Sequence, residues 1–509
     1  MDSLTVLLPA AYIAVLGVLS LFGLHRLHVL WLYRRHRGER PVASPLDTLP
    51  TVTVQLPVFN ERAVVGRLVD AACRLDWPLD RLEIQILDDS TDDTVAQSRA
   101  LAARWRTHGV DVRVLHRTDR TGYKAGALAA GLRECKGDVI AMFDADFVPE
   151  AGFLLRVVPH LMGDDGIGMV QARWGHLNEN RNLLTRLSAV LLDGHFVLEH
   201  TARNRSGRFF NFNGTAGIWR RRCIEEAGGW AHDTLVEDLD LSYRAQLKGW
   251  RFVFLKDEVV DAELPSDIRG FKIQQRRWAE GTLQAARKLL PVVLRAPLRR
   301  AVKFEAMAHM LANLAYPLVV LLAVLMPPAI LLRGTTSLWA FLFLDIPAFL
   351  LATASVATFY AVSQNEAHGQ WRDKAWRLPL LMALGIGMSV SQSLAVFGGL
   401  FGNNLVFRRT PKSGTGAAPE NVTRIYRPAV GWTPVVEVVL ALWMFGGAGV
   451  ALSMGQFGSL PFMLLFGFGF AYVGVTSFLP APAPAPVEIP APAPVEVPAP
   501  ARSRVRATS

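Results

Sequence analysis

Long apolar runs at both ends of the chain constrain its fold more than any other feature. They lie at residues 4–24, 304–332, 338–362, 378–401, 430–454 and 457–479. Each has about the 20 apolar residues that a helix needs to cross the hydrocarbon core of a bilayer. The stretch 45–300 contains no run of this length. The chain is therefore predicted to be a multi-pass integral membrane protein, in contact with the lipid bilayer, that carries one large soluble insert.

Basic residues predict how the chain crosses the membrane. Five arginines between positions 26 and 40 follow the first apolar run, and no small-residue cleavage site does. The positive-inside rule makes this run a retained anchor with its N-terminus outside. The stretches 364–377 and 403–429 are also basic and expected in the cytoplasm, so the segment 378–402 between them cannot cross once. Its Gln392, serines and glycines favour an interfacial helix, which leaves five crossings.

Cysteine usage predicts the compartment of the insert. Cys73, Cys135 and Cys223 lie far apart in the chain. They lack the paired spacing of a zinc site, and their odd number argues against a disulfide framework. The insert is therefore expected on a reducing, cytosolic face. The membrane is expected to be the bacterial inner membrane, or the Golgi membrane in a eukaryotic source.

Residues 480–509 form a tail rich in Pro and Ala, with three arginines near its end. Such a segment cannot bury a core and is expected to be extended and disordered. The simpler interpretation of the tail is a spacer without chemistry. The alternative is a tether to an accessory protein or to anionic lipid.

The insert alternates between strand-like and helix-like stretches. Strands are predicted at 52–57, 84–87, 112–116, 139–143 and 169–171, with helices at 62–75 and 94–107. This order predicts an α/β fold with a mostly parallel sheet and helices on both faces. Ligands of such sheets bind at the carboxyl ends of the strands, where Asp88, Asp89 and Asp144 fall. No G-x-G-x-x-G follows the first strand, which disfavours a dinucleotide cofactor.

Acidic residues at these strand ends indicate a site for a metal-bound nucleotide diphosphate. Asp144 and Asp146 are separated by one residue and can bind one divalent ion together. Oxygens of the diphosphate then complete the coordination of that ion. Lys124 lies among small residues, where its ammonium can reach phosphate oxygens. Each residue also has a simpler interpretation: the acids could belong to turns or cap helices, and Lys124 could be an ordinary surface lysine. The order of the acids before a basic and aromatic stretch at 274–278 favours sugar transfer from a nucleotide sugar.

Several motifs together are more specific than any one of them. They are Gln55-Leu-Pro-Val-Phe-Asn-Glu, Leu87-Asp-Asp-Ser-Thr-Asp, Gly122-Tyr-Lys-Ala-Gly-Ala-Leu, Phe143-Asp-Ala-Asp-Phe, Gln171-Ala-Arg-Trp, Phe212-Asn-Gly-Thr, Val236-Glu-Asp-Leu-Asp-Leu and Gln274-Gln-Arg-Arg-Trp. The stretch 52–287 that holds them resembles the family 2 glycosyltransferases, which implies a GT-A-like fold. It is most similar to the plant cellulose synthase-like A and C groups, the mannan or glucomannan and glucan synthases. Cellulose synthases have Thr and Cys where this chain has Val236 and Asn213, and both differences match the mannan synthase-like group.

The resemblance implies a role for each matching residue. Asp88 and Asp89 would contact the nucleoside, Lys124 the diphosphate, and Asp144 with Asp146 the nucleotide and a Mg²⁺ or Mn²⁺ ion. Asp238 would be the catalytic base of an inverting transfer. Gln274 and Arg277 would bind the pyrophosphate, Trp278 would stack on the acceptor sugar, and Asn213, Gly214 and Thr215 would shape the acceptor end of the pocket.

Phe407-Arg-Arg-Thr410-Pro-Lys412 resembles the gating loop of cellulose synthases, in which the Thr and Lys reach the nucleotide phosphates. The alternative is an ordinary basic loop beside the membrane. The predicted organisation is an anchor at 1–44, a cytosolic GT-A-like domain at 45–300, a membrane region at 301–479 and a tail at 480–509. The membrane region includes the interfacial helix at 378–402 and the gating-like loop at 403–429.

Three classes of function are open at this point. The first is a processive inverting β-glycosyltransferase that passes a polysaccharide, mannan, glucomannan or β-glucan, through the membrane. The second is a single-addition transferase with a lipid acceptor, and the third is a silent scaffold, against which the intact acids argue. A net charge of +10 suits an anionic membrane surface and nucleotide donors, and no nucleic-acid module is apparent. The motifs leave open whether the donor is GDP-mannose or UDP-glucose.

Overall fold

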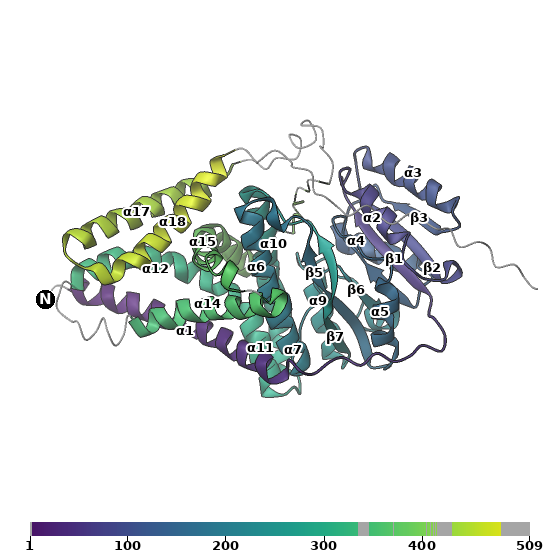
Figure 1. Ribbon diagram of the computed structural model, residues 1–509, viewed down its shortest axis with the longest axis horizontal. Coiled ribbons are helices and arrows are strands. Elements are labelled where there is room, and N and C mark those ends of the chain that lie inside the picture. The colour runs from purple at the N-terminus through teal and green to yellow at the C-terminus, as the bar shows by residue number, and fades with distance from the viewer. Residues whose placement is uncertain are drawn as a thin grey trace, which may run out of the picture.

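The computed structural model describes most of the chain. The described residues are 3–333, 346–369, 371–403, 405–407, 409, 410, 412, 414 and 430–479. Within them a sheet domain lies at one end of the molecule and a group of long helices at the other (Figure 1). The tail at 480–509, most of the stretch 403–429 and part of the apolar run at 338–362 lie outside the described residues.

A seven-stranded sheet forms the centre of the soluble domain. Its strands are β1 (Val52–Val58), β2 (Leu82–Asp88), β3 (Asp111–His116), β4 (Val139–Met142), β5 (Ile167–His176), β6 (Gly217–Arg220) and β7 (Arg251–Ala262). They are ordered β3-β2-β1-β4-β6-β5-β7, and β6 runs antiparallel to both of its neighbours while the other pairs are parallel. The predicted mostly parallel α/β sheet is confirmed, and β6 and β7 extend it beyond the five predicted strands.

Helices cover both faces of the sheet. One face packs against α2 (Val65–Ala72), α3 (Thr94–Arg106) and α5 (Phe153–Met162), and the other against α4 (Tyr123–Glu134), α8 (Arg221–Glu226) and α9 (Glu237–Leu247). Burial on both faces explains why the central strands are apolar at nearly every position. The helix predicted at 62–75 begins later, because the Glu61 carbonyl accepts the N–H groups of Val64 and Val65 in a turn.

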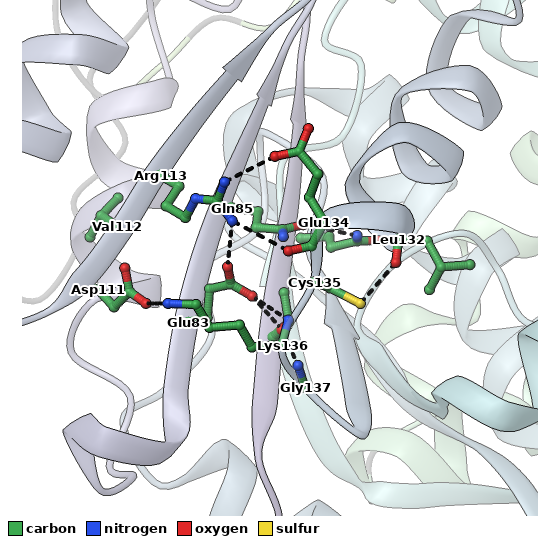
Figure 2. Close-up of polar contacts among 12 residues, drawn as sticks. Glu83, Gln85, Asp111, Val112, Arg113, Leu132, Glu134, Cys135, Lys136 and Gly137 are labelled. Atoms are coloured by element: carbon green, nitrogen blue, oxygen red, sulfur yellow. Dashed lines mark hydrogen bonds and ion pairs between the residues drawn. The ribbon is translucent and has the colours of Figure 1, made fainter.

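A buried carboxylate joins the amino-terminal ends of the strands, at the edge opposite to the ligand-binding edge (Figure 2). Glu83 on β2 accepts hydrogen bonds from Thr53 Oγ1 at 2.8 Å, Arg113 Nη1 at 3.3 Å and the Lys136 N–H at 2.9 Å. Arg113 also pairs with Glu134 at the end of α4. These contacts fix β1, β2 and β3 against the loop that leads into β4.

Among the described residues, five helical segments are long and apolar enough to cross a membrane, by length and composition. They are the segments Val6–His36, Arg300–Leu332, Arg377–Phe401, Thr433–Ser453 and Phe457–Phe478. The helices concerned are α1 (Ser3–His36), α11 (Arg300–Leu311) with α12 (Ala315–Arg333), α15 (Arg377–Phe401), α17 (Thr433–Ser453) and α18 (Leu460–Phe478). The group differs from the predicted set, because it includes α15 and lacks α14 (Ile346–His368), the described part of the run at 338–362.

The direction of α15 differs from that of its neighbours. In Figure 1, α1, α12, α14, α17 and α18 run along the long axis, whereas α15 is seen nearly end-on and so runs across them. α15 is also the most buried of the five candidate spans. This orientation is compatible with the predicted interfacial helix, which stays a prediction.

A layer of helices joins the sheet domain to the long helices. It contains α6 (Leu183–Asp193), a π-helix (Gly194–His200), α7 (Thr201–Arg205) and α10 (Ile268–Arg295) (Figure 1). α10 begins at a cap in which Asp267 accepts the N–H groups of Arg269 and Gly270. One apolar core unites residues of α1, α6, the π-helix, α14 and α15. The sheet domain is thus packed directly against the helices that approach the membrane.

Candidate active site

A cavity opens at the carboxyl ends of the parallel strands, where ligands bind in sheets of this kind. The ends of β1, β2 and β4 form its wall together with α9, α10 and described residues of the stretch 407–412. Most predicted site residues line it: Asp89, Lys124, Asp144, Asp146, Asn213, Asp238, Gln274, Arg277, Trp278, Thr410 and Lys412. The fold therefore gathers residues from distant parts of the chain into one site.

Lys124 lies at the centre of a group of carboxylates. Its Nζ is 2.5 Å from Asp144 Oδ1 and 3.8 Å from Glu237 Oε1, and it donates a hydrogen bond of 2.9 Å to the Gly214 carbonyl. Burial lowers the pKa of Lys124, but the charges of Asp144 and Glu237 outweigh burial and hold the pKa above its ordinary value. The ammonium is charged and faces the cavity, where it can bind an anionic diphosphate.

Two ion pairs hold the described residues of the stretch 407–412 on the cavity. Lys412 Nζ contacts Asp146 Oδ2, and Arg409 makes a two-pronged pair with Glu61 at 2.9 and 2.6 Å. The Phe407 ring lies under the Arg277 guanidinium, with 4.7 Å between the Arg277 Cζ and the ring centroid. The described residues of the gating-like loop are therefore part of the wall of the site.

The two acids at the end of β2 have different positions. Asp89 lines the cavity and accepts hydrogen bonds from Arg117 Nε at 2.8 Å and Nη2 at 2.6 Å. Asp88 is fully buried, does not line the cavity and accepts the Ser90 N–H at 2.8 Å. This placement supports the predicted nucleoside contact for Asp89 and not for Asp88, which shapes the turn that carries Asp89.

Asp238 lies in the first turn of α9 and lines the cavity. Burial, and then the neighbouring charge of Glu237, raise the pKa of Asp238 to about 7, while Lys124 acts in the opposite direction. Its Oδ1 accepts the Leu239 N–H at 2.8 Å. A carboxyl group that titrates near neutral pH can take up a proton from a substrate hydroxyl.

Gln274, Arg277 and Trp278 project from α10 into the cavity. Their spacing of three and four residues puts them on one face of the helix. Trp278 approaches Trp174 with 6.3 Å between the ring centroids, so the two rings form an aromatic wall. Such a wall suits the apolar face of a sugar ring.

The Asn213-Gly214-Thr215 turn supports the site in two ways. Asn213 lines the cavity, whereas Gly214 and Thr215 do not. Gly214, at φ +81°, turns its carbonyl to Lys124, and Thr215 Oγ1 accepts the Asp144 N–H at 2.8 Å. Gly214 and Thr215 thus hold Lys124 and Asp144 in place, and of the three residues of this turn only Asn213 reaches the cavity.

Sequence reasoning missed several residues of the wall. Glu61 and Arg409 form the ion pair described above, and Phe59 stacks with Arg120, whose Cζ is 3.2 Å from the ring centroid. Glu61 and Phe59 lie within the motif that begins at Gln55, so that motif could have indicated that they belong to the wall. The sequence around Arg120 offers no comparable signal, because the stacking depends on the fold.

Asp144 and Asp146 are candidate ligands of a divalent ion. In the described residues no group of three or more His, Cys, Asp or Glu side chains is arranged to hold a metal. Asp144 and Asp146 instead contact the cationic groups of Lys124 and Lys412. Two carboxylates completed by diphosphate oxygens are a suitable ligand set for a hard cation. The residues therefore fit an ion that is bound together with a nucleotide.

Two further cavities continue from the first toward the long helices. The second shares Asn213, Asp238 and Trp278 with the first. The third shares Arg26, Gln275, Tyr316 and Tyr360 with the second and is lined by residues of α1, α12, α14 and α15. The three cavities are adjacent, and Asp238 lies between the first two.

Comparison with known proteins agrees with this geometry. Residues 50–281 match the family described as Glycosyltransferase like family 2. That range contains every strand of the sheet and the first half of α10. The chain therefore contains a family 2 glycosyltransferase domain, and the GT-A-like fold expected of it is confirmed.

Two curated relatives show what this domain is similar to. It is 47% identical to Glucomannan 4-beta-mannosyltransferase 2 of Arabidopsis thaliana over 253 residues, 49% of this chain and 47% of that protein. It is 45% identical to Glucomannan 4-beta-mannosyltransferase 1 of Oryza sativa subsp. japonica over 255 residues, 49% of each chain. The chain thus spans about half the length of the curated relatives it matches.

One solved structure shares the fold over a longer range. It is a mannosyltransferase from Pyrobaculum calidifontis in complex with GDP-Man and Mn²⁺, 22% identical to this chain with a TM-score of 0.50. The likeness covers 77% of this chain and 99% of that one. The part of this chain that shares the fold is longer than residues 50–281, so the common fold extends beyond the family 2 domain.

Proposed function

We propose that this protein is a membrane-embedded, inverting glycosyltransferase that extends a β-linked polysaccharide of the mannan or glucomannan type. GDP-mannose is the proposed donor, with UDP-glucose as the second candidate. The observation that carries the proposal is the position of Asp238, between a cavity lined with cations and carboxylates and further cavities toward the long helices. The names of the curated relatives support the choice of mannose, and the series of adjacent cavities supports a polymer over a single sugar on a lipid.

Cationic side chains would bind the donor through its diphosphate. Lys124, Arg277 and Lys412 come from three elements and line the same cavity. Asp144 and Asp146 would hold a Mg²⁺ or Mn²⁺ ion, which when bound neutralises charge on the departing diphosphate. The described residues of the stretch 407–412 would act as a lid that excludes water, so that the sugar is transferred and not hydrolysed.

Asp238 would activate the acceptor. A hydroxyl of the chain end attacks the anomeric carbon on the side opposite to the diphosphate, so a new C–O bond forms as the bond from that carbon to the diphosphate oxygen breaks. The hydroxyl proton moves to Asp238, and the bonding electrons leave with the nucleoside diphosphate. Trp278 would hold the acceptor ring by stacking. One-step displacement inverts the anomeric configuration and yields a β-linkage from an α-linked donor.

Location follows from the charges beside the membrane helices. The arginines after the first apolar run would place the sheet domain in the cytosol, where nucleotide sugars are made. The proposed membrane is the inner membrane of a bacterium, or the Golgi membrane in a eukaryote. The proposed partners are the nucleotide sugar, the growing polysaccharide and the bilayer, and an accessory protein bound by the tail at 480–509 remains the minor alternative.

The test is a transfer assay with the purified full-length chain. GDP-mannose and UDP-glucose are supplied separately, with Mg²⁺, with Mn²⁺ or with excess chelator, and any product is digested with β-mannanase or cellulase. We expect mannanase-sensitive product from GDP-mannose that chelator abolishes. A product found only in the lipid fraction as a single added sugar, or full activity in chelator, would contradict the proposal.

A further inference from the structure

A π-helix interrupts the helix that separates the active site from the long helices. The segment Gly194–His200 follows α6 directly and continues into α7. π-Helical turns are rare and occur frequently at functional sites. Bonds from residue i to i+5 bring residues four and five positions apart onto one side of the helix. Accordingly His195 Nδ1 is 3.0 Å from Glu199 Oε2, and the His195 and His200 rings are 4.3 Å apart.

The two histidines of the π-helix hold the Asn213 amide in one orientation. His200 Nε2 lies 2.5 Å from Asn213 Oδ1, and Asn213 Nδ2 lies 3.0 Å from His195 Nε2. An amide oxygen only accepts, so His200 donates from Nε2. A carboxylate also only accepts, so His195 donates from Nδ1 to Glu199 and its Nε2 must accept from Asn213. Burial keeps the pKa of His200 well below its ordinary value, so this ring is neutral.

This arrangement leaves one hydrogen of the Asn213 amide without a partner among the described residues. Asn213 lines both the first cavity and the second, as do Asp238 and Trp278. The second cavity also exposes His195 and Glu199 beside aromatic rings such as Trp174. Hydrogen-bonding groups between aromatic walls suit a neutral carbohydrate, whose hydroxyls need partners and whose ring face needs apolar contact.

We propose that the π-helix Gly194–His200 is an acceptor-positioning element, in which His195 and His200 aim the Asn213 amide at a hydroxyl of the terminal acceptor sugar. The inference rests on the proposed function and adds to it residues that lie outside the sequence motifs. His195 is a positioning residue, because it acts through Asn213. The contact fixes the chain end so that a neighbouring hydroxyl of the same sugar faces Asp238.

A line of ion pairs anchors this element to the first helix. Glu199 pairs with Arg203 at 3.3 Å, Arg203 pairs with Glu305 at 2.9 Å, and Glu305 lies 3.1 Å from His25 on α1. Arg203 and Glu305 are buried, and a buried pair of this kind is costly to break from one side. The orientation of His195 is therefore set by the junction between the soluble domain and α1.

Substitution of His195 tests the proposal with a matched pair of variants. His195→Gln keeps one acceptor for Asn213 and one donor for Glu199, whereas His195→Leu removes both. β-1,4-Mannohexaose and cellohexaose are titrated into the full-length protein without donor, and binding is followed by tryptophan fluorescence. We expect His195→Leu to weaken hexasaccharide binding about tenfold, the effect of one lost hydrogen bond, and His195→Gln to bind nearly as the parent does. The control is His108→Leu, at an exposed histidine after α3.

Hexasaccharide binding tests the acceptor-positioning role of His195 without any sugar transfer. Parent-like affinity in His195→Leu, or no hexasaccharide binding by the parent protein, would overturn it. Binding that depends on His195 in a protein that transfers no sugar would uphold the acceptor site and reject the proposed function. A melting temperature unchanged from the parent shows that weaker binding in His195→Leu is not a folding defect.

Discussion

At the scale of single residues, the site depends on carboxylates whose charges are balanced by different partners. Asp89 is neutralised by Arg117 and Asp144 by Lys124, whereas Asp238 is half-buried beside Glu237, a second negative charge. Uptake of a proton by Asp238 relieves this repulsion. This difference in partners is what separates the proposed base from the proposed metal ligands.

Replacing the proposed base should remove turnover and preserve donor binding. Asp238→Asn keeps the size of the side chain and loses proton acceptance, so turnover should fall at least about 10²-fold, the usual scale for a general base. Nucleotide affinity measured by calorimetry should stay close to that of the parent. Asp233→Asn, at an exposed residue paired with Lys288, is the matched control. Near-normal turnover in folded Asp238→Asn would exclude Asp238 as the base.

The pH dependence should report the raised pKa of Asp238. The base must be ionised to act, so kcat/KM for the donor should fall as pH decreases through about 7, the value to which burial and Glu237 raise this pKa. Glu237→Gln removes one cause of the rise, and the acidic limb should move to lower pH. Glu225→Gln, at a half-exposed residue on α8, should leave it in place. An unmoved limb in Glu237→Gln would show that another group titrates.

At the scale of elements, the described residues of the gating-like loop form a lid held by two ion pairs. Lys412 meets Asp146 and Arg409 meets Glu61, so these residues contact a proposed metal ligand and the turn that follows β1. Thr410 is buried, and its Oγ1 has no hydrogen-bond partner among the described residues. A phosphate oxygen would satisfy this hydroxyl, which supports the predicted role of Thr410.

Loss of the lid lysine should slow the reaction. A hydrogen bond to a charged phosphate contributes about 1.5–3 kcal/mol, so Lys412→Ala should reduce turnover about tenfold or more. Hydrolysis of the donor by water should rise relative to transfer, because an open lid admits water. The comparison is Lys248→Ala, at an exposed lysine after α9. An unchanged rate and an unchanged ratio of hydrolysis to transfer would dismiss the lid.

The sequence predicted elements better than it predicted their junctions. The first five strands and the acids at their ends follow from local patterns, because a strand buried on both faces must be apolar and must end in a polar turn. β6 is short and pairs antiparallel with β4 and β5, so its identity depends on neighbours far away in the chain. The π-helix and the stacking of Arg120 on Phe59 are tertiary features without a local signal.

At the scale of the whole molecule, a series of three adjacent cavities leads from the sheet domain into the helical region. The second cavity ends where Arg26, Gln275, Tyr316 and Tyr360 meet, and the third begins at the same residues. Gln275 belongs to α10, the helix that also carries Gln274, Arg277 and Trp278. One helix therefore lines the first cavity and the place where the second and third cavities adjoin.

Obstructing this series of cavities should shorten the product and leave the first transfer intact. Gln275→Trp puts a bulky ring where the second and third cavities meet, beyond the reacting groups, so a chain could accept a first sugar but could not advance. With short acceptors in large excess, the parent should yield long products, as a processive enzyme does, whereas Gln275→Trp should yield products extended by a few sugars. Arg276→Trp, at the neighbouring half-exposed position, is the control. The products are sized by gel or mass spectrometry. Addition of one sugar per acceptor by the parent would contradict processivity. Chains of parent length from Gln275→Trp would show that the product leaves by another route.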